Sequence, residues 1–216
     1  MNELEGEVKV SRTHEYKKID PATVFKLAWY AVASKPGVLL ANHSEAESQS
    51  FKGEAMFTAR IDQKPIKVKV DVDEEKGSIE ITGWGEDEVA LGTYLDSTMD
   101  AFEKSSDKYL SLADEEKQKL RRALIAKTCW DRVIHKILNK APLSEIYFQL
   151  AHGREMMIKA TKGDELNPIT LTTSGWLSRI EPLPKDETPP AGIATALAKK
   201  CIEWKKGTQE VIQNLL

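Results

Sequence analysis

Hydrophobic and charged residues alternate in several stretches of the first 85 positions, and this pattern predicts the strands of one sheet. The clearest run is Ile66–Val72, where valine and isoleucine alternate with lysine and aspartate. Such alternation is typical of a strand with one buried and one solvated face. Ile79 and Ile81 resume the alternation after Asp73–Gly77, which predicts a hairpin. Further strand signals lie at Val8–Val10, Gly37–Ala41 and Ser50–Ile61.

Two segments of the same region have helical spacing instead. Asp20 and Pro21 are typical of a helix start, and the helix that they begin extends to about Ser34. A second helix follows Gly85, with hydrophobic residues three or four positions apart at Leu91, Leu95, Met99 and Phe102. The order β-α-β-β-β-β-α predicts an α+β fold, an antiparallel sheet of about five strands with helices on one face. In outline it is similar to a reduced helix-grip arrangement, by element order alone.

The C-terminal half is mainly helical in its pattern. A long helix is expected from Ser111–Asp114 to Asn139, and a shorter one from Ser144 to Gly153. Met156–Ala160 and Ile169–Thr172 have the composition of two short strands that could form a hairpin. A terminal helix carries a hydrophobic stripe at Leu197, Cys201, Trp204, Thr208, Val211 and Leu215.

These elements divide the chain into four parts. Residues 1–110 form an α+β sheet module, and residues 111–180 form a helical region with the short hairpin. Residues 181–192 contain four prolines, which neither a helix nor a central strand accommodates, so we expect a connector there. Residues 193–216 form the C-terminal amphipathic helix, whose stripe needs a cover, either its own domain or a partner.

The charge and the cysteines limit the class of protein. Residues 1–100 hold 12 Lys and Arg against 19 Asp and Glu (net −7), and residues 101–216 hold 19 against 15 (net +4). The acidic start lacks the regions of a secretory signal, and the longest apolar run has seven residues against the ~20 of a membrane span. Cys129 and Cys201, the only cysteines, are expected to be buried free thiols. These features predict a soluble cytoplasmic protein.

No motif marks a catalytic, cofactor or metal site. Gly83-Trp84-Gly85 is followed by three acidic residues, which would repel a phosphate. The carboxylates of Asp71–Glu75 superficially resemble a calcium loop, but the glycine and the twelfth position do not fit, and a hairpin tip explains them. We therefore assign no catalytic, cofactor or metal residue. The missing motifs favour a protein that is not an enzyme. An enzyme whose active site has no recognisable sequence motif is the alternative.

Five cations along the long helix form a candidate patch for an anionic partner. On a helical wheel they lie opposite the hydrophobic side, where RNA, DNA, an anionic membrane or an acidic protein could dock. A solvated helix face explains the same pattern, since lysine and arginine are good helix formers. The patch consists of Lys117, Arg121, Arg132, Lys136 and Lys140.

Two of the five tryptophans are candidates for contact with a partner. Trp29, Trp130 and Trp204 lie on hydrophobic helix stripes, so core packing explains them. Trp84 and Trp176 lie near glycines in expected turns, where an indole can be exposed.

Three functional hypotheses follow from these patterns. The first is a non-catalytic binding or assembly protein that associates with a protein partner, or with itself, through the C-terminal helix. The second is a helix-grip-like module that encloses an apolar small ligand between its sheet and a helix. The third is a nucleic-acid-binding protein that uses the basic helix 115–140, which the overall charge does not favour.

Overall fold

The computed structural model describes residues 7–46 and 50–216, and the chain forms two compact units. Unit 1 ends at Ser111 and unit 2 extends from Leu112 to Leu216. Each unit is described by itself below.

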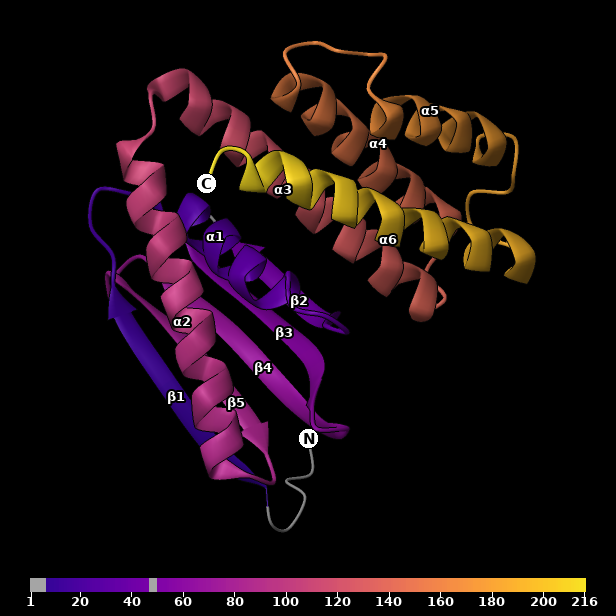
Figure 1. Cartoon of the computed structure of the whole chain (residues 1–216). Coiled ribbons are helices and arrows are strands. Elements are labelled where there is room, and N and C mark those ends of the chain that lie inside the picture. The colour runs from indigo at the N-terminus through magenta and orange to yellow at the C-terminus, as the bar shows by residue number, and fades with distance from the viewer. Residues whose placement is uncertain (1–6, 47–49) are drawn as a thin grey trace. The chain divides into compact units, whose positions relative to one another are not determined.

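Unit 1 is built on a five-stranded antiparallel sheet with the strand order β1-β5-β4-β3-β2 (Figure 1). The first strand therefore pairs with the last one, while the other strands follow one another as hairpins. The strands are β1 (Val8–Glu15), β2 (Leu39–Ala46), β3 (Lys52–Ile61), β4 (Lys64–Asp73) and β5 (Ser78–Gly85).

Helices α1 (Pro21–Ala33) and α2 (Glu88–Ser111) pack on one face of this sheet, as Figure 1 shows. The Asp20 carboxylate accepts a hydrogen bond from the Thr23 backbone N–H at 2.9 Å and caps α1. The predicted α+β class and the predicted order of the seven elements are confirmed. The second strand is displaced from its expected position, because β2 extends to Ala46 with a bulge after Leu40.

The space between the helices and the sheet is filled with side chains. Phe25, Trp29 and Phe57 are fully buried there, and the rings of Trp29 and Phe57 lie 5.3 Å apart. A Cβ atom at Gly53 would lie 2.8 Å from Phe25, and one at Gly83 would lie 2.7 Å from Leu91. Such close approach packs the helices tightly on the sheet, which does not favour an enclosed ligand between them.

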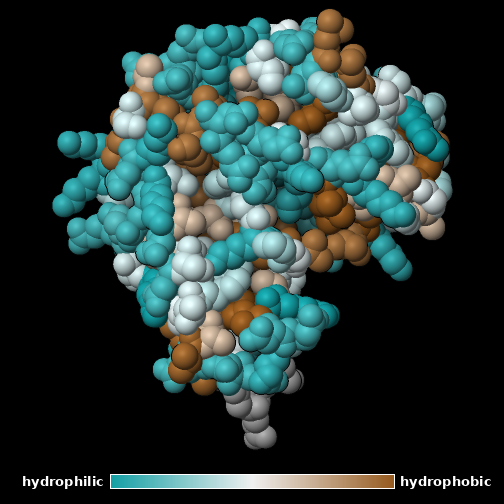
Figure 2. Space-filling model, viewed as in Figure 1, coloured by the Kyte–Doolittle hydropathy of each residue, from teal (hydrophilic) through white to brown (hydrophobic). Residues whose placement is uncertain are grey.

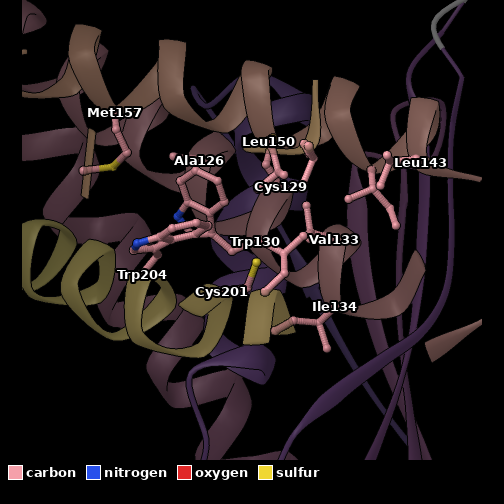
Figure 3. Packing of buried hydrophobic residues seen from close by; sticks show 13 residues of the cluster. Ala126, Cys129, Trp130, Val133, Ile134, Leu143, Leu150, Met157, Cys201 and Trp204 are labelled. Atoms are coloured by element: carbon pink, nitrogen blue, oxygen red, sulfur yellow. The ribbon is translucent and has the colours of Figure 1, made fainter. Parts of the chain in front are cut away.

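Unit 2 consists of four helices around one hydrophobic cluster. Helix α3 (Asp114–Leu138) packs against α4 (Leu143–Ala160) and α6 (Ala191–Gln213), and α5 (Pro168–Ile180) packs mainly against α4. Trp130 and Trp204 lie side by side in the cluster with their ring centroids 5.4 Å apart, as Figure 3 shows. Trp130 Nε1–H donates to Thr208 Oγ1 at 3.0 Å, so this buried indole is satisfied.

The expected hairpin between residues 156 and 172 is wrong. Helix α4 continues through Met156–Ala160, and Ile169–Thr172 lies in α5. Gly153 does not end a helix, because it lies inside α4 where a Cβ atom would come within 2.6 Å of Trp130. The helix ends seven residues later at Ala160. Shortly after that end, Gly163 takes a left-handed φ of 83°, and its N–H donates to the Ile158 carbonyl at 2.8 Å.

The hydrophobic stripe of α6 is covered within its own unit. Leu197, Cys201 and Trp204 belong to the same buried cluster as residues of α3. Both cysteines are buried and free, as predicted. The stripe therefore needs no second protein to cover it.

The segment before α6 is irregular and also caps another helix. The backbone N–H groups of Leu143 and Ser144 donate to the carbonyls of Glu187 and Lys185 at 2.8 and 2.9 Å. These bonds satisfy two of the N–H groups that the first turn of α4 leaves without intrahelical acceptors.

In the face of the molecule that Figure 2 presents, hydrophilic residues cover most of the surface and hydrophobic ones form separate patches. Among the described residues, no helix combines the length and the hydrophobicity that crossing a bilayer requires.

Candidate ligand-binding site

A surface hollow of about 490 Å³ lies in unit 1, where the end of β1 and the segment after it meet the last turns of α2. Its walls combine apolar, hydroxyl and charged side chains. We name it the β1–α2 hollow, and its lining comprises Thr13, His14, Glu15, Tyr16, Lys17, Ile19, Phe102, Ser106, Asp107 and Leu110.

The alternation of β1 directs its even-numbered side chains toward α2. Arg12 forms an ion pair with Asp96 of α2, with Nε and Oδ1 2.5 Å apart, and His14 contacts Glu103 two turns further along that helix. The backbone N–H of Tyr16 donates to the Gly77 carbonyl at 3.2 Å, which continues the strand ladder beyond the end of β1. The α2 wall and the β1 part of the other wall are thus fixed by regular secondary structure, while Tyr16, Lys17 and Ile19 lie in the segment between β1 and α1.

His14 is oriented by a carboxylate and an aromatic ring. Its Nδ1 lies 2.9 Å from Glu103 Oε1, and the Phe102 ring meets the imidazole edge-on at 5.8 Å between centroids. A carboxylate only accepts hydrogen bonds, so Nδ1 carries the proton and Nε2 is an acceptor whenever the imidazole is neutral. This arrangement selects one tautomer of His14.

Two hydroxyls of the hollow are buried without a hydrogen bond. Ser106 is 8% exposed, and neither its Oγ nor the hydroxyl of Tyr16 has a partner among the residues that the structure describes. Ser105, its neighbour in α2, instead donates to the Ala101 carbonyl at 2.8 Å. Burial raises the pKa of Tyr16, and the nearby carboxylates of Glu74 and Asp73 raise it further. Tyr16 therefore stays a neutral hydroxyl at physiological pH.

This combination is suited to binding a small molecule. The volume falls in the range of about 300–1,000 Å³ that is common for ligand pockets. Buried polar groups in proteins are nearly always paired, so an unpaired hydroxyl in a hollow is a group that a ligand could satisfy. Within the described residues Ser106 Oγ has no hydrogen bond to an imidazole, so the geometry lacks the serine–histidine contact of an activated nucleophile.

The five cations of the sequence-derived patch lie on α3 or directly after it, in unit 2. Two of them are engaged with carboxylates, since Lys136 pairs with Glu145 of α4 and Lys117 Nζ lies 3.9 Å from Asp114. Arg132 is half-buried, while Arg121 and Lys140 are exposed. The helix therefore does not present five equivalent cations to one partner.

The two candidate tryptophans lie in regular elements, which corrects their expected placement in turns. Trp84 is half-buried in β5, where the register places it between Lys9 of β1 and Lys67 of β4, and Lys9 Nζ lies 5.9 Å from its ring centroid. Trp176 lies in α5 at the margin of the unit 2 cluster, with the Arg179 guanidinium 5.0 Å from its ring. The structure does not bring the two tryptophans together, since they belong to different units.

A buried ionic cluster in unit 2 is a further feature that sequence reasoning missed. Asp131 and Lys127 are almost fully buried in α3, and Asp131 forms an ion pair with Lys205 of α6. Burial lowers the pKa of Lys127 to about 8, although the charge of Asp131 opposes this shift. Burial also raises the pKa of the Cys201 thiol, so that this cysteine remains protonated.

The carboxylates at the β4–β5 hairpin pair with lysines. Asp71 lies 2.9 Å from Lys69 Nζ, and Asp73 lies 3.6 Å from Lys52 Nζ. In the part of the chain that the structure describes, no group of three or more histidine, cysteine or acidic residues has the geometry to hold a metal ion.

Comparison with protein-family models, curated proteins and solved structures finds no significant match to this chain. The assignment of function below therefore relies on the geometry of the molecule.

Proposed function

We propose that the protein binds a small polar molecule in the β1–α2 hollow of unit 1. The observation that carries this proposal is the pair of buried hydroxyls, Ser106 and Tyr16, which lack hydrogen bonds within the described residues. An unmade hydrogen bond at a buried polar group costs about 1–3 kcal/mol. A ligand that completes these bonds recovers that free energy as affinity.

The hollow has the contacts that orient such a ligand. The apolar side chains of Phe102 and Ile19 form its buried wall, and the Glu103 carboxylate holds His14 in one tautomer. Because His14 lies on a strand and Phe102 and Glu103 lie on a helix, this part of the site is preorganised, and little ordering of it is needed on binding. We place this binding in a reducing cytoplasm, which the two buried free thiols support.

The test is a screen of a polar fragment library against the ¹⁵N-labelled full-length protein by NMR. Fragments that bind in the hollow should shift the amide resonances of residues 13–19 and 102–110. The variant Ser106→Leu, which fills the hollow, should abolish those shifts.

Ser105→Ala is the matched control for this screen. It removes a buried serine from the same helix, but one whose hydroxyl is already bonded to Ala101, so the fragments should still bind. Shifts that persist in Ser106→Leu, or a library without a fragment that shifts these residues, would contradict the proposal.

A second candidate function is docking of an acidic protein segment on the sheet face opposite α1 and α2. Trp84 lies there between Lys9 and Lys67 in one cross-strand row. Lys67 Nζ lies 3.4 Å from Glu7 Oε1, so Lys9, 5.9 Å from the indole ring, is the cation that an acidic partner would meet. This combination suits a partner with carboxylates beside an apolar group.

We favour this docking over two hypotheses drawn from the sequence. Association through α6 loses its basis because the α6 stripe packs within unit 2. Nucleic-acid binding by α3 is disfavoured because Lys117 and Lys136 pair with carboxylates.

Fluorotryptophan NMR with a short polyglutamate peptide tests this second function. The peptide should shift the Trp84 resonance and leave that of Trp176 in place, and Lys9→Glu should abolish the effect. An uncharged polyglutamine peptide that shifts Trp84 equally would contradict the role of charge.

A further inference from the structure

The charges and hydrogen-bonding groups of the β1–α2 hollow select one chemical class of ligand. We infer that the hollow binds an organic cation, a protonated amine attached to an apolar body. This inference rests on the proposed function and specifies its ligand.

The charge of the walls is negative once their internal pairs are considered. Lys17 Nζ lies 3.9 Å from Glu15 and offsets it, and Glu103, next to the hollow, is bonded to His14. Asp107 lines the hollow, and no cation of the described residues lies within ion-pair distance of it. Asp107 therefore leaves the lining with a negative charge that a cation would balance.

The two unpaired hydroxyls and the imidazole of the walls can each accept a hydrogen bond, although the hydroxyls can also donate one. The hydroxyl oxygens of Ser106 and Tyr16 have free lone pairs, and Nε2 of neutral His14 accepts because Nδ1–H is committed to Glu103. An ammonium group has three donors and no acceptor, so it complements such a set. A carboxylate or a phosphate would face the negative charge of Asp107 instead.

The apolar body of the ligand has its own contact surface. Phe102 is fully buried and Ile19 is 7% exposed, whereas Leu110 at the rim of the hollow is 38% exposed. An aromatic or branched aliphatic group that covers Leu110 removes apolar surface from water. The hollow thus pairs an apolar wall with an acidic, acceptor-rich one, which is the pattern of an amphipathic amine.

Three probes that share one apolar body test the charge requirement. Calorimetric titration of the full-length protein with phenethylamine, 2-phenylethanol and phenylacetate compares a cation, a neutral molecule and an anion. The cation should bind at least about tenfold more tightly than the anion, since like charges at close range disfavour the latter, and its affinity should fall with added salt.

Asp107→Asn should weaken the binding of phenethylamine about threefold, the size expected of one exposed ion pair. The affinity for 2-phenylethanol should stay unchanged. Asp100→Asn is the matched control, because Asp100 is exposed on the same helix and does not line the hollow. Equal binding of the cation and the anion would overturn the inference, as would an Asp107→Asn variant with unchanged amine affinity.

The variant Ser106→Leu separates failure of the inference from failure of the proposed function. If it abolishes binding of phenylethanol or phenylacetate and the cation is not preferred, the hollow is a ligand site of another class and the inference alone fails. If it leaves the binding of every probe unchanged, ligands do not occupy the hollow and the proposed function fails as well. Absence of binding by all three probes overturns the inference.

Discussion

Buried polar groups differ between the β1–α2 hollow and the hydrophobic cluster around Trp130 and Trp204 in unit 2. In the cluster, Trp130 donates to Thr208 at 3.0 Å, and Trp204 donates to Thr172 at 2.8 Å. In the hollow, the hydroxyls of Ser106 and Tyr16 have no such bond within the described residues. Paired groups in a packed core stabilise the fold, whereas buried unpaired groups lower its stability until a partner bonds to them. On the function proposed above, the contrast separates a region that stabilises the fold from one that binds a ligand.

The largest expected effect tests the structural side of this comparison. Trp130→Ala removes the central indole of the cluster and should lower the free energy of unfolding of unit 2 by about 4 kcal/mol, since a cavity replaces a large side chain. Urea unfolding followed by far-UV circular dichroism measures this loss. Trp176→Ala, at the margin of the same cluster, should cost clearly less, and equal losses would contradict the central role of Trp130.

The next largest effect on stability is expected at the buried Lys127 of unit 2, and it depends on pH. Burial lowers the pKa of Lys127 from 10.5 to about 8 in the folded protein. Between these pH values the unfolded chain binds more protons, so stability rises as the pH increases from about 8 to 10.5. Lys127→Met removes the buried charge and leaves Asp131 paired with Lys205. It should stabilise the protein by about 1–3 kcal/mol at pH 7 and remove that rise.

Thermal unfolding of Lys127→Met across this pH range measures the effect. Lys159→Met is the control, because that side chain is about half exposed and its replacement should leave the pH dependence of the native protein intact. A Lys127→Met variant that is less stable at pH 7 would show that the ammonium is well compensated in the folded state.

The smallest effects compare the two regions directly. Thr208→Val leaves Trp130 Nε1–H buried without an acceptor and should cost about 1–2 kcal/mol. Tyr16→Phe removes a buried hydroxyl that makes no bond to the described residues and should raise stability by about 1 kcal/mol, because the cost of the unmade bond disappears. Urea unfolding of the two variants under the same conditions provides the comparison, and a larger loss in Tyr16→Phe would contradict the distinction between the regions.

The fold of unit 1 could be predicted because its signals are local. The alternation Ile66–Val72 and the Asp20–Pro21 helix start each depend on neighbouring residues. In unit 2 the local signals were misleading. Gly153 has the appearance of a helix end, yet its lack of a side chain makes room for Trp130 of another helix. Thr172 and Thr173, typical of strands, bond to backbone carbonyls four residues earlier in α5.

The candidate site could not be predicted, for a related reason. His14 and Glu103 are 89 positions apart in the chain, and no spacing rule joins an edge strand to a helix at that distance. Nor does the sequence distinguish Ser106 from Ser105, because only the folded helix shows which hydroxyl is bonded to a carbonyl. The position of Trp84 could not be predicted either, because its place in a cross-strand row follows only from the strand register.

The close pair of indoles in unit 2 also gives the molecule an intrinsic optical signal. Rings 5.4 Å apart and tilted by 54° are near enough for their electronic transitions to couple. Coupled indoles contribute a distinctive circular dichroism band that requires both rings to be fixed, so it vanishes when α3 and α6 separate. Trp29 and Trp84 belong to unit 1 and lie outside this pair. The state of one half of the chain can therefore be followed without any label.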